Sequence, residues 1–337
     1  MADTVLSAFV TCALCFVVLL CGCFINLVLY CLAPAQHDSQ LDYYGLRLAT
    51  ASSDRTVRIF SPTGGSPPQH TLSAELVGHD GPVWQVSWAH PSFGGLLASA
   101  GFDGRVILWK EDVATSTWRR AYEYSWHASS VNSVAFAPSA YGLAFACASS
   151  DGFVSIVTHN PADGTWNDVR VSDAADGGAQ THALGASSVS FAPATFGGLG
   201  EPDGALPPLR IVTGGCDALV KVWSRTADGA WVRDGPPLTA HREWVRSVAW
   251  APSIGGGRDV IASGGQDKRV VVWTRGDSGG SWDKKELPDF GAPVWSVSWT
   301  PAGGVLGVAS GDSSVTMWKE GESGWALLNR LDEPEAK

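Results

Sequence analysis

Short apolar stretches, separated by turn residues, recur along the chain from residue 36 onward. In one copy they are Val83–Trp88, Leu96–Ala100, Val106–Trp109 and Trp118–Tyr124. Within each stretch apolar residues alternate with small or polar ones, and Gly, Pro and Asp stand between the stretches. This alternation is typical of β-strands joined by tight turns, so it predicts four strands in each copy and an all-β fold.

The copies are marked by an aspartate that is followed three residues later by a valine and six residues later by a bulky apolar residue. Most of these aspartates are 45 to 50 residues apart. One spacing of 66 residues contains a Gly- and Pro-rich insertion, Phe196–Leu209, which we expect to be a loop. Four strands in each unit of about 40–50 residues predict a six-bladed WD40 β-propeller. The six aspartates are Asp54, Asp103, Asp151, Asp217, Asp267 and Asp312.

Four of the six copies also carry a histidine nine residues before an inner-strand aromatic residue, and this histidine and the aspartate resemble catalytic groups. In a WD40 blade these residues are structural. The aspartate accepts hydrogen bonds from a tight turn and orients a buried histidine, which bridges to a hydroxyl and on to a tryptophan. The predicted networks are His79–Ser99–Asp103–Trp109, His182–Thr213–Asp217–Trp223 and His241–Ser263–Asp267–Trp273.

Two blades depart from this pattern. In the third, Cys147 and Val157 replace the hydroxyl and the tryptophan, and in the sixth Val308 and Phe290 replace the hydroxyl and the histidine. The chain has no nucleophile elbow, phosphate loop or HExxH motif. We therefore expect no enzymatic activity, no catalytic residue and no cofactor.

Charge and cysteine content narrow the classes of partner. The net charge is −10 and no basic run is present, so a nucleic-acid partner and direct lipid contact by the propeller are not expected. Five of the seven cysteines lie in the first 31 residues, including Cys12-x-x-Cys15 and Cys21-x-Cys23. Without neighbouring His or acidic ligands they do not indicate a metal site, and the remaining two indicate a reducing compartment.

The first 35 residues differ from the body of the chain. Val5–Leu32 is 28 residues long and uncharged, which is enough to cross a membrane as a helix. Three interpretations stay open: a membrane anchor, a signal peptide cleaved near Ala33-Pro34-Ala35, and an extension without function. The predicted organisation is an N-terminal extension at 1–35, a propeller at 36–331 and an acidic tail at 332–337.

The two ends of the propeller predict an open ring. The body begins at an innermost strand, Ser39–Tyr44, and ends at an outermost strand, Trp325–Leu331, and only residues 24–32 offer a spare strand. The first and sixth blades would then expose sheet surface that a partner strand can cover. Residues predicted on or near this seam are Leu41, Tyr43, Tyr44, Trp295, Val297 and Trp299.

Several runs of the sequence resemble the Sec-thirteen family. They are HDSQLDYYGLRLATASSDRTVRIF (37–60), GHDGPVWQVSWAHPSFGGLLASAGFDGRVILWKE (78–111), HASSVNSVAFAPSAYG (127–142), VTGGCDALVKVW (212–223) and WVRSVAWAPS (244–253). The resemblance implies an open six-bladed propeller that a larger partner completes with a seventh blade. It also implies a non-catalytic scaffold of the COPII outer coat in ER-to-Golgi transport and of the nuclear pore Y-complex.

The partners implied by the resemblance are a Sec-thirty-one-type coat subunit, an α-helical Y-complex nucleoporin and a regulatory complex of the TOR pathway. The implied locations are the cytoplasmic face of the endoplasmic reticulum membrane, COPII vesicles and the nuclear pore. Two alternatives remain: a membrane-anchored propeller, and an adaptor that binds peptides through cations at the mouth of its channel. The candidate cations are Arg105, Lys268 and Arg269.

Overall fold

The computed structural model describes residues 36–63, 69–172, 178–194, 206–252, 257–276, 280–288, 290–322 and 324–331. The predicted N-terminal extension and acidic tail, and most of the predicted loop at Phe196–Leu209, lie outside the described residues. The chain divides into two compact units, Met1–Phe136 and Ala137–Lys337. Each unit is described by itself.

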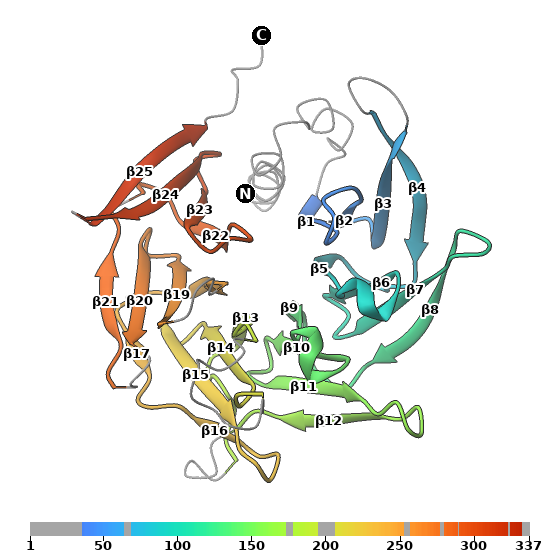
Figure 1. Cartoon of the computed structure of the whole chain (residues 1–337), viewed down its shortest axis with the longest axis horizontal. Coiled ribbons are helices and arrows are strands. Elements are labelled where there is room, and N and C mark those ends of the chain that lie inside the picture. The colour runs from blue at the N-terminus through green and yellow to red at the C-terminus, as the bar shows by residue number, and fades with distance from the viewer. Residues whose placement is uncertain are drawn as a thin grey trace. The chain divides into compact units, whose positions relative to one another are not determined.

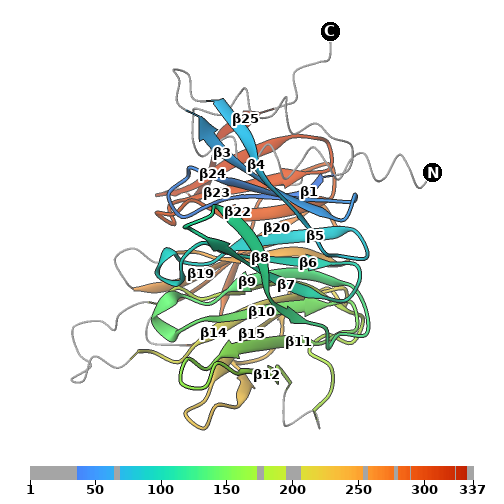
Figure 2. The same ribbon diagram turned by 90° about the vertical axis from the view of Figure 1, so that its right-hand side faces the viewer.

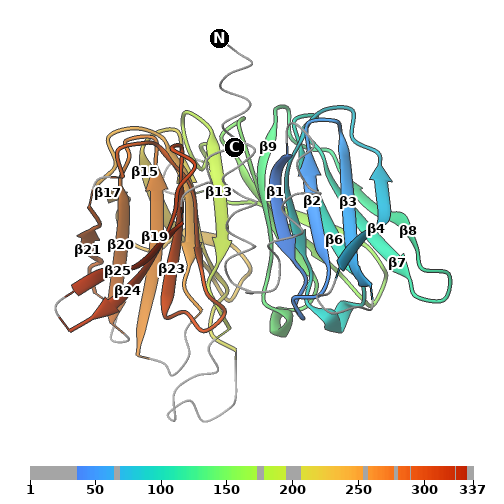
Figure 3. The same cartoon turned by 90° about the horizontal axis from the view of Figure 1, so that it is seen from above.

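Unit 1 holds the first two blades and the innermost strand of the third. Its elements are β1 (Gln36–Leu41), β2 (Leu48–Ser52), β3 (Thr56–Thr63), β4 (Gln69–Val77), β5 (Val83–Trp88), η1 (Pro91–Phe93), β6 (Leu96–Gly101), β7 (Val106–Asp112), β8 (Thr117–Tyr124) and β9 (Val131–Phe136). Strands β1, β2, β3 and β4 lie side by side in that order (Figure 3). Strand β5 of the second blade runs alongside β1 of the first (Figure 2).

Unit 2 holds the other described strands of the third blade and the last three blades. Its elements are η2 (Ser139–Tyr141), β10 (Ala144–Ser149), β11 (Val154–His159), β12 (Trp166–Arg170), β13 (Ala186–Phe191), β14 (Arg210–Gly215), β15 (Leu219–Arg225), β16 (Trp231–Arg233), β17 (Leu238–Thr239), β18 (Val245–Trp250), β19 (Arg258–Gly265), β20 (Val270–Gly276), β21 (Asp283–Glu286), β22 (Val294–Trp299), β23 (Val305–Ser310), β24 (Val315–Gly321) and β25 (Gly324–Leu331).

The strands form six antiparallel sheets, and within each sheet they follow one another in chain order (Figure 1). The fourth sheet carries one short extra strand, β17, which pairs with β15. This is the architecture expected from the repeats: an all-β chain of six four-stranded blades. In the second blade the four predicted strands are all present, with bounds that differ by at most three residues.

The predicted first strand, Ser39–Tyr44, is wrong, because β1 ends at Leu41. Leu41 pairs with Leu48 as Trp88 pairs with Leu97, so Leu41 takes the place of the repeated aromatic residue. The predicted strand lies three residues too far along the chain, because the tyrosines that follow Leu41 suggest an aromatic residue at this position. Tyr43 instead lies in a turn that the Asp42 carboxylate holds by accepting hydrogen bonds from backbone N–H groups.

The apolar core lies between neighbouring blades. In unit 1 it joins Val57 of the first blade to Val86 and Leu97 of the second, and equivalent clusters join blades 4 and 5 and blades 5 and 6 in unit 2. The blades approach so closely that a Cβ on Gly264 would lie 2.5 Å from Val294 of the next blade. Small residues on the second strands therefore let each blade pack face to face on its neighbour.

Candidate functional site

The second blade contains a closed network of buried polar groups. His79 donates from Nδ1 to the Asp103 carboxylate at 3.0 Å, and its Nε2 shares a hydrogen bond of 2.8 Å with Ser99 Oγ. Trp109 Nε1 donates to the same hydroxyl at 2.9 Å. The Asp103 carboxylate also accepts from the backbone N–H of Arg105, which fixes the tight turn. The structure thus brings together the four residues that the sequence grouped.

The fourth and fifth blades repeat this geometry. The histidine-to-carboxylate distances are 2.9 and 3.0 Å, and the tryptophan-to-hydroxyl distances are 3.1 and 2.9 Å. The residues are His182, Thr213, Asp217 and Trp223 in the fourth blade, and His241, Ser263, Asp267 and Trp273 in the fifth.

The electrostatics of these networks match a structural role. Burial raises the pKa of Asp103, Asp217 and Asp267, but hydrogen bonds from histidine and backbone N–H groups outweigh burial, so each pKa lies below its usual value. Burial lowers the pKa of His182 more than Asp217 raises it. Each carboxylate is therefore ionised and used within its own blade.

The sixth blade satisfies its tryptophan in a way that sequence spacing missed. Trp318 Nε1 donates to Thr316 Oγ1 at 2.9 Å. Thr316 lies on β24 directly opposite Val308, which occupies the usual hydroxyl position. In this blade β24 supplies the hydroxyl in place of β23. Phe290 packs its ring against Trp318 at the position of the histidine. A threonine opposite an apolar residue at the hydroxyl position is the signal that was available in the sequence.

A second pattern links the inner strands β1, β5, β13 and β18 to the next blade. In unit 1, Asp38 Oδ2 accepts from Val86 N at 3.1 Å, and Gln85 Oε1 accepts from Val134 N at 2.7 Å. In unit 2 the same register position is a serine, whose hydroxyl oxygen accepts from a backbone N–H group of the next blade. The unit 2 pairs are Ser188 with Val248 at 3.1 Å and Ser247 with Val297 at 3.2 Å.

Two residues further along β1, β13 and β18 a second acceptor meets the next blade. Gln40 Oε1 accepts from Trp88 N at 2.7 Å, and the Gln40 carbonyl accepts from Trp88 Nε1 at 2.9 Å. In unit 2 the Ala249 carbonyl accepts from Trp299 Nε1 at 3.1 Å. The corresponding register positions on the sixth blade are Ser296 and Ser298, because β22 pairs with β23 as β18 pairs with β19.

The predicted seam residues of the sixth blade contact the fifth. Val297 and Trp299 are buried, at 4% and 8% exposure, and both bond to β18. The ring of Trp295 lies 4.8 Å from the guanidinium carbon of Arg246, which also belongs to β18. Their part in a partner seam stays a prediction.

The predicted seam residues of the first blade lie at the end of β1 and in the turn that follows it. Leu41 is the last residue of β1 and is partly buried. Tyr43 and Tyr44 are each 67% exposed, and their rings meet edge to face at 5.3 Å. Tyr43 also contacts His90 at 5.0 Å. An aromatic pair therefore stands on the surface of unit 1, and its role at a seam also stays a prediction.

The cations proposed for a peptide adaptor have other surroundings. Arg105 forms an ion pair with Asp80 at 3.0 Å, and Arg269 forms one with Glu286 at 3.1 Å. Lys268 lies in the tight turn after β19 with a positive φ of 65°. Two of the three charges are therefore already neutralised.

Within the part of the chain that the structure describes, no group of three or more His, Cys, Asp or Glu side chains is placed to hold a metal ion. Over the same residues, no helix combines the length and the apolar character that crossing a bilayer requires.

Comparisons with known proteins agree with the repeat pattern. The WD40 family (WD domain, G-beta repeat) matches residues 68–110, 118–157, 236–274 and 280–319, which together with the six sheets confirms the predicted fold class. The chain is 46% identical over 303 residues to "Protein SEC13 homolog" of Drosophila melanogaster, covering 87% of this chain and 80% of that protein. It is 41% identical over 309 residues to "Protein transport protein sec13" of Aspergillus fumigatus, covering 88% and 96%. It is 38% identical over 345 residues to "Protein transport protein SEC13" of Mycosarcoma maydis, covering 88% and 92%.

Proposed function

Because this chain belongs to the Sec13 family of WD40-repeat proteins, we propose that it is a non-catalytic scaffold subunit in vesicular protein transport. Its larger partner is a Sec-thirty-one-type subunit of the COPII outer coat, which supplies a seventh blade. The complex acts at the cytoplasmic face of the endoplasmic reticulum membrane and on COPII vesicles. The printed names of the fungal relatives, which call them protein transport proteins, support transport as the primary role.

The observation that carries this proposal is the acceptors on the inner strands β1, β5, β13 and β18. Side-chain or carbonyl oxygens of these strands accept N–H groups of the next blade, at two positions on β1, β13 and β18 and at one on β5. Ser296 and Ser298 offer the same two positions on the sixth blade. An added strand that donates at these positions would continue the pattern, which is β-strand addition by a partner.

The same surface serves the other proposed assemblies. A blade from an α-helical nucleoporin of the Y-complex would meet the same two serines, and so would a subunit of the TOR regulatory complex. These roles differ in the partner and not in the binding chemistry. We therefore place the nuclear pore and signalling roles after the coat role, which the relatives' names favour.

The test measures binding of the purified full-length protein to the Sec-thirty-one-type subunit of the same organism. Ser296→Ala removes one acceptor, so affinity should fall about 2- to 10-fold, the equivalent of one net hydrogen bond of about 0.5–1.5 kcal/mol. Ser298→Arg places a charged chain on the same face and should abolish binding. Ser247→Ala is the matched control, because its hydroxyl already bonds to Val297 within unit 2.

Stability of the free protein separates a partner surface from an internal one. Ser247→Ala should lower the melting temperature of the free chain, whereas Ser296→Ala should leave it unchanged. An equal loss of stability in both variants would show that a segment of this chain already covers Ser296. Unchanged partner binding in both Ser296→Ala and Ser298→Arg would overturn the proposal.

A further inference from the structure

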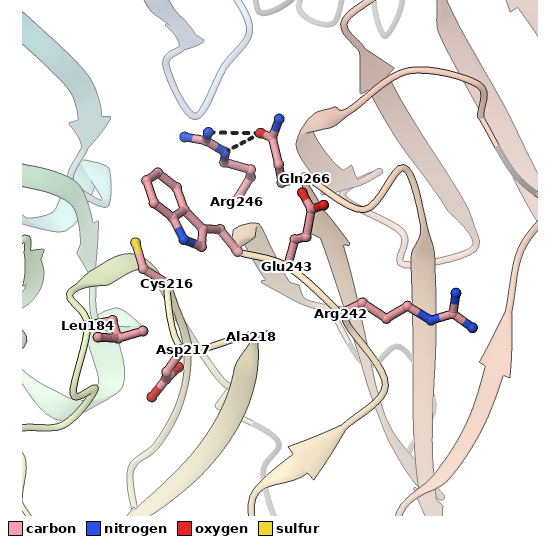
Figure 4. Close-up of a pocket in the computed structure, with 9 residues that line it drawn as sticks. Leu184, Cys216, Asp217, Ala218, Arg242, Glu243, Arg246 and Gln266 are labelled. Carbon is pink, nitrogen blue, oxygen red and sulfur yellow. Dashed lines mark hydrogen bonds between the residues drawn. The ribbon is translucent and has the colours of Figure 1, made fainter.

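Arg246 lies at an irregular position on the inner strand of the fifth blade. The pairing of β18 with β19 shifts between Val245 and Ser247, so Arg246 is the extra residue of a β-bulge. Bulges re-aim a side chain away from the regular alternation of a strand. Arg246 Nε and Nη2 both donate to Gln266 Oε1, at 3.0 and 2.8 Å (Figure 4).

Two tryptophans hold the guanidinium from the sides. Its central carbon lies 4.9 Å from the ring centre of Trp244 and 4.8 Å from that of Trp295. Gln266 accepts hydrogen bonds from one edge of the guanidinium, and no described residue accepts from the N–H groups of Nη1. A guanidinium carries five N–H donors, so a second edge remains for a ligand.

Arg246 lacks the carboxylate partner that comparable arginines in this protein have. Burial lowers the pKa of Arg246, and no carboxylate of the described residues forms an ion pair with it. An arginine that is partly buried without a counter-ion is costly unless a ligand brings the negative charge. Other arginines over tryptophan rings do meet carboxylates: Arg47 with Asp42, Arg210 with Asp259, and Arg275 with Asp234.

The unpaired cation opens into a pocket of about 570 Å³ in unit 2. Its wall includes Cys216 and two exposed apolar side chains, Leu184 at 69% and Trp244 at 48%. The Asp217 carboxylate also borders the pocket, but it bonds to His182 and points away from Arg246 (Figure 4). Glu243 stands on the rim.

We propose that this pocket binds an acidic side chain on a peptide segment of a partner protein. The carboxylate would lie against Nη1 of Arg246, and an adjoining apolar side chain would rest on Trp244 and Leu184. Arg242 also lines the pocket, but its guanidinium points away from Arg246 (Figure 4), so a single carboxylate matches the one cation between the tryptophans. Glu243 and the net charge of −10 oppose a polyanion such as nucleic acid. The site goes beyond the proposed scaffold function, because it does not use Ser296 or Ser298.

The test titrates the full-length protein with end-blocked, fluorescein-labelled peptides and follows fluorescence anisotropy. The probes are Gly-Ser-Leu-Asp-Leu-Ser-Gly and its two analogues with Glu or Asn at the central position. At low salt we expect one acidic peptide to bind at least 10-fold more tightly than the Asn peptide, with the preference shrinking as salt rises. No binding of either acidic peptide up to 1 mM, or equal binding of the Asn peptide, would overturn the proposal.

Three variants locate the binding. Arg246→Gln should weaken the acidic peptide at least 10-fold, and Glu243→Gln should tighten it. Arg225→Gln makes the same charge change as Arg246→Gln at an exposed residue at the end of β15, and it should have no effect. Equal weakening by both arginine variants would mean general charge attraction and would refute the pocket.

Two further readouts keep the test decisive if Arg246→Gln does not fold. Arg246→Lys keeps the charge but not the planar fork, so it should retain only part of the affinity. In the wild-type protein, saturating acidic peptide should slow alkylation of Cys216, measured by mass spectrometry. Unchanged alkylation with bound peptide would place the peptide elsewhere and refute the assignment.

Discussion

Two buried serines offer a test of what the histidine networks contribute. Ser263 and Ser155 are both fully buried in strands of unit 2. Ser263 Oγ bonds to His241 Nε2 and to Trp273 Nε1, whereas Ser155 Oγ has no hydrogen-bond partner among the described residues. Substitution of each by alanine is the same chemical change at the same burial.

The magnitudes follow from the groups that each change leaves behind. Ser263→Ala strands two buried groups, His241 Nε2 and Trp273 Nε1, at about 1–3 kcal/mol each, so we expect a loss of about 3 kcal/mol. Ser155→Ala strands none and removes a buried hydroxyl that lacks a partner, so it should be neutral or stabilising. With an unfolding entropy of about 2.1 cal/mol/K per residue, 3 kcal/mol lowers the melting temperature of a 337-residue chain by about 4 °C.

The assay is thermal unfolding of the full-length protein, followed by tryptophan fluorescence and by far-UV circular dichroism. Ser263→Ala should melt about 4 °C below wild type and Ser155→Ala at or above it. A Ser263→Thr variant keeps the hydroxyl, as Thr213 does in the fourth blade, and should recover most of the loss. Equal destabilisation by Ser263→Ala and Ser155→Ala would show that lost packing, and not the network, sets the cost.

Three further predictions concern other buried groups. Burial raises the Asp38 pKa from 3.8 to about 6, so the stability that the protonated side chain contributes is lost as pH rises between those values. Asp38→Asn should therefore stabilise the protein above pH 6 by up to about 3 kcal/mol and should not stabilise it below pH 4. Urea unfolding midpoints measure the difference. Thr316→Val should cost about 1–2 kcal/mol by stranding Trp318 Nε1, and Thr316→Ser should not; identical melting curves would contradict this. Burial holds the His182 pKa below its usual 6.5, so the stability that the neutral ring provides is lost as pH falls below 6.5. Wild type should therefore lose more stability between pH 7 and 5 than His182→Gln. Parallel plots of stability against pH for the two proteins would disprove the role of His182.

Repeat spacing predicted the blades because each strand is anchored by residues at fixed offsets from the aspartate. Strand β5 begins and ends where the pattern placed it. The first strand failed because its aromatic position is filled by Leu41, and a nearby tyrosine suggested the wrong register. The reliable marker there is Asp38, whose carboxylate meets the next blade as Gln85 does, but a hydrogen bond between blades leaves no aromatic signature.

The chemistry between blades was harder to predict than the chemistry within them. His79, Ser99 and Asp103 belong to one blade and are close in the sequence, so fixed offsets between them predict the network. The Arg246 guanidinium instead lies against both Trp244 and Trp295, which are 51 residues apart in the sequence and belong to different blades. Such a site becomes visible only when the packing of neighbouring blades is known.

The acceptor pattern constrains any strand that follows the sixth blade. The donating N–H groups come from residues two apart, an apolar residue and then an aromatic one, as in Val86 with Trp88 and Val297 with Trp299. Proline at either position would remove a donor, so it should be absent from the partner strand. Because Ser296 has a short side chain, as Ser247 does, the added strand must approach as closely as β22 approaches β18. A partner strand of this apolar-x-aromatic pattern therefore fits, and a strand with charged residues at both positions does not.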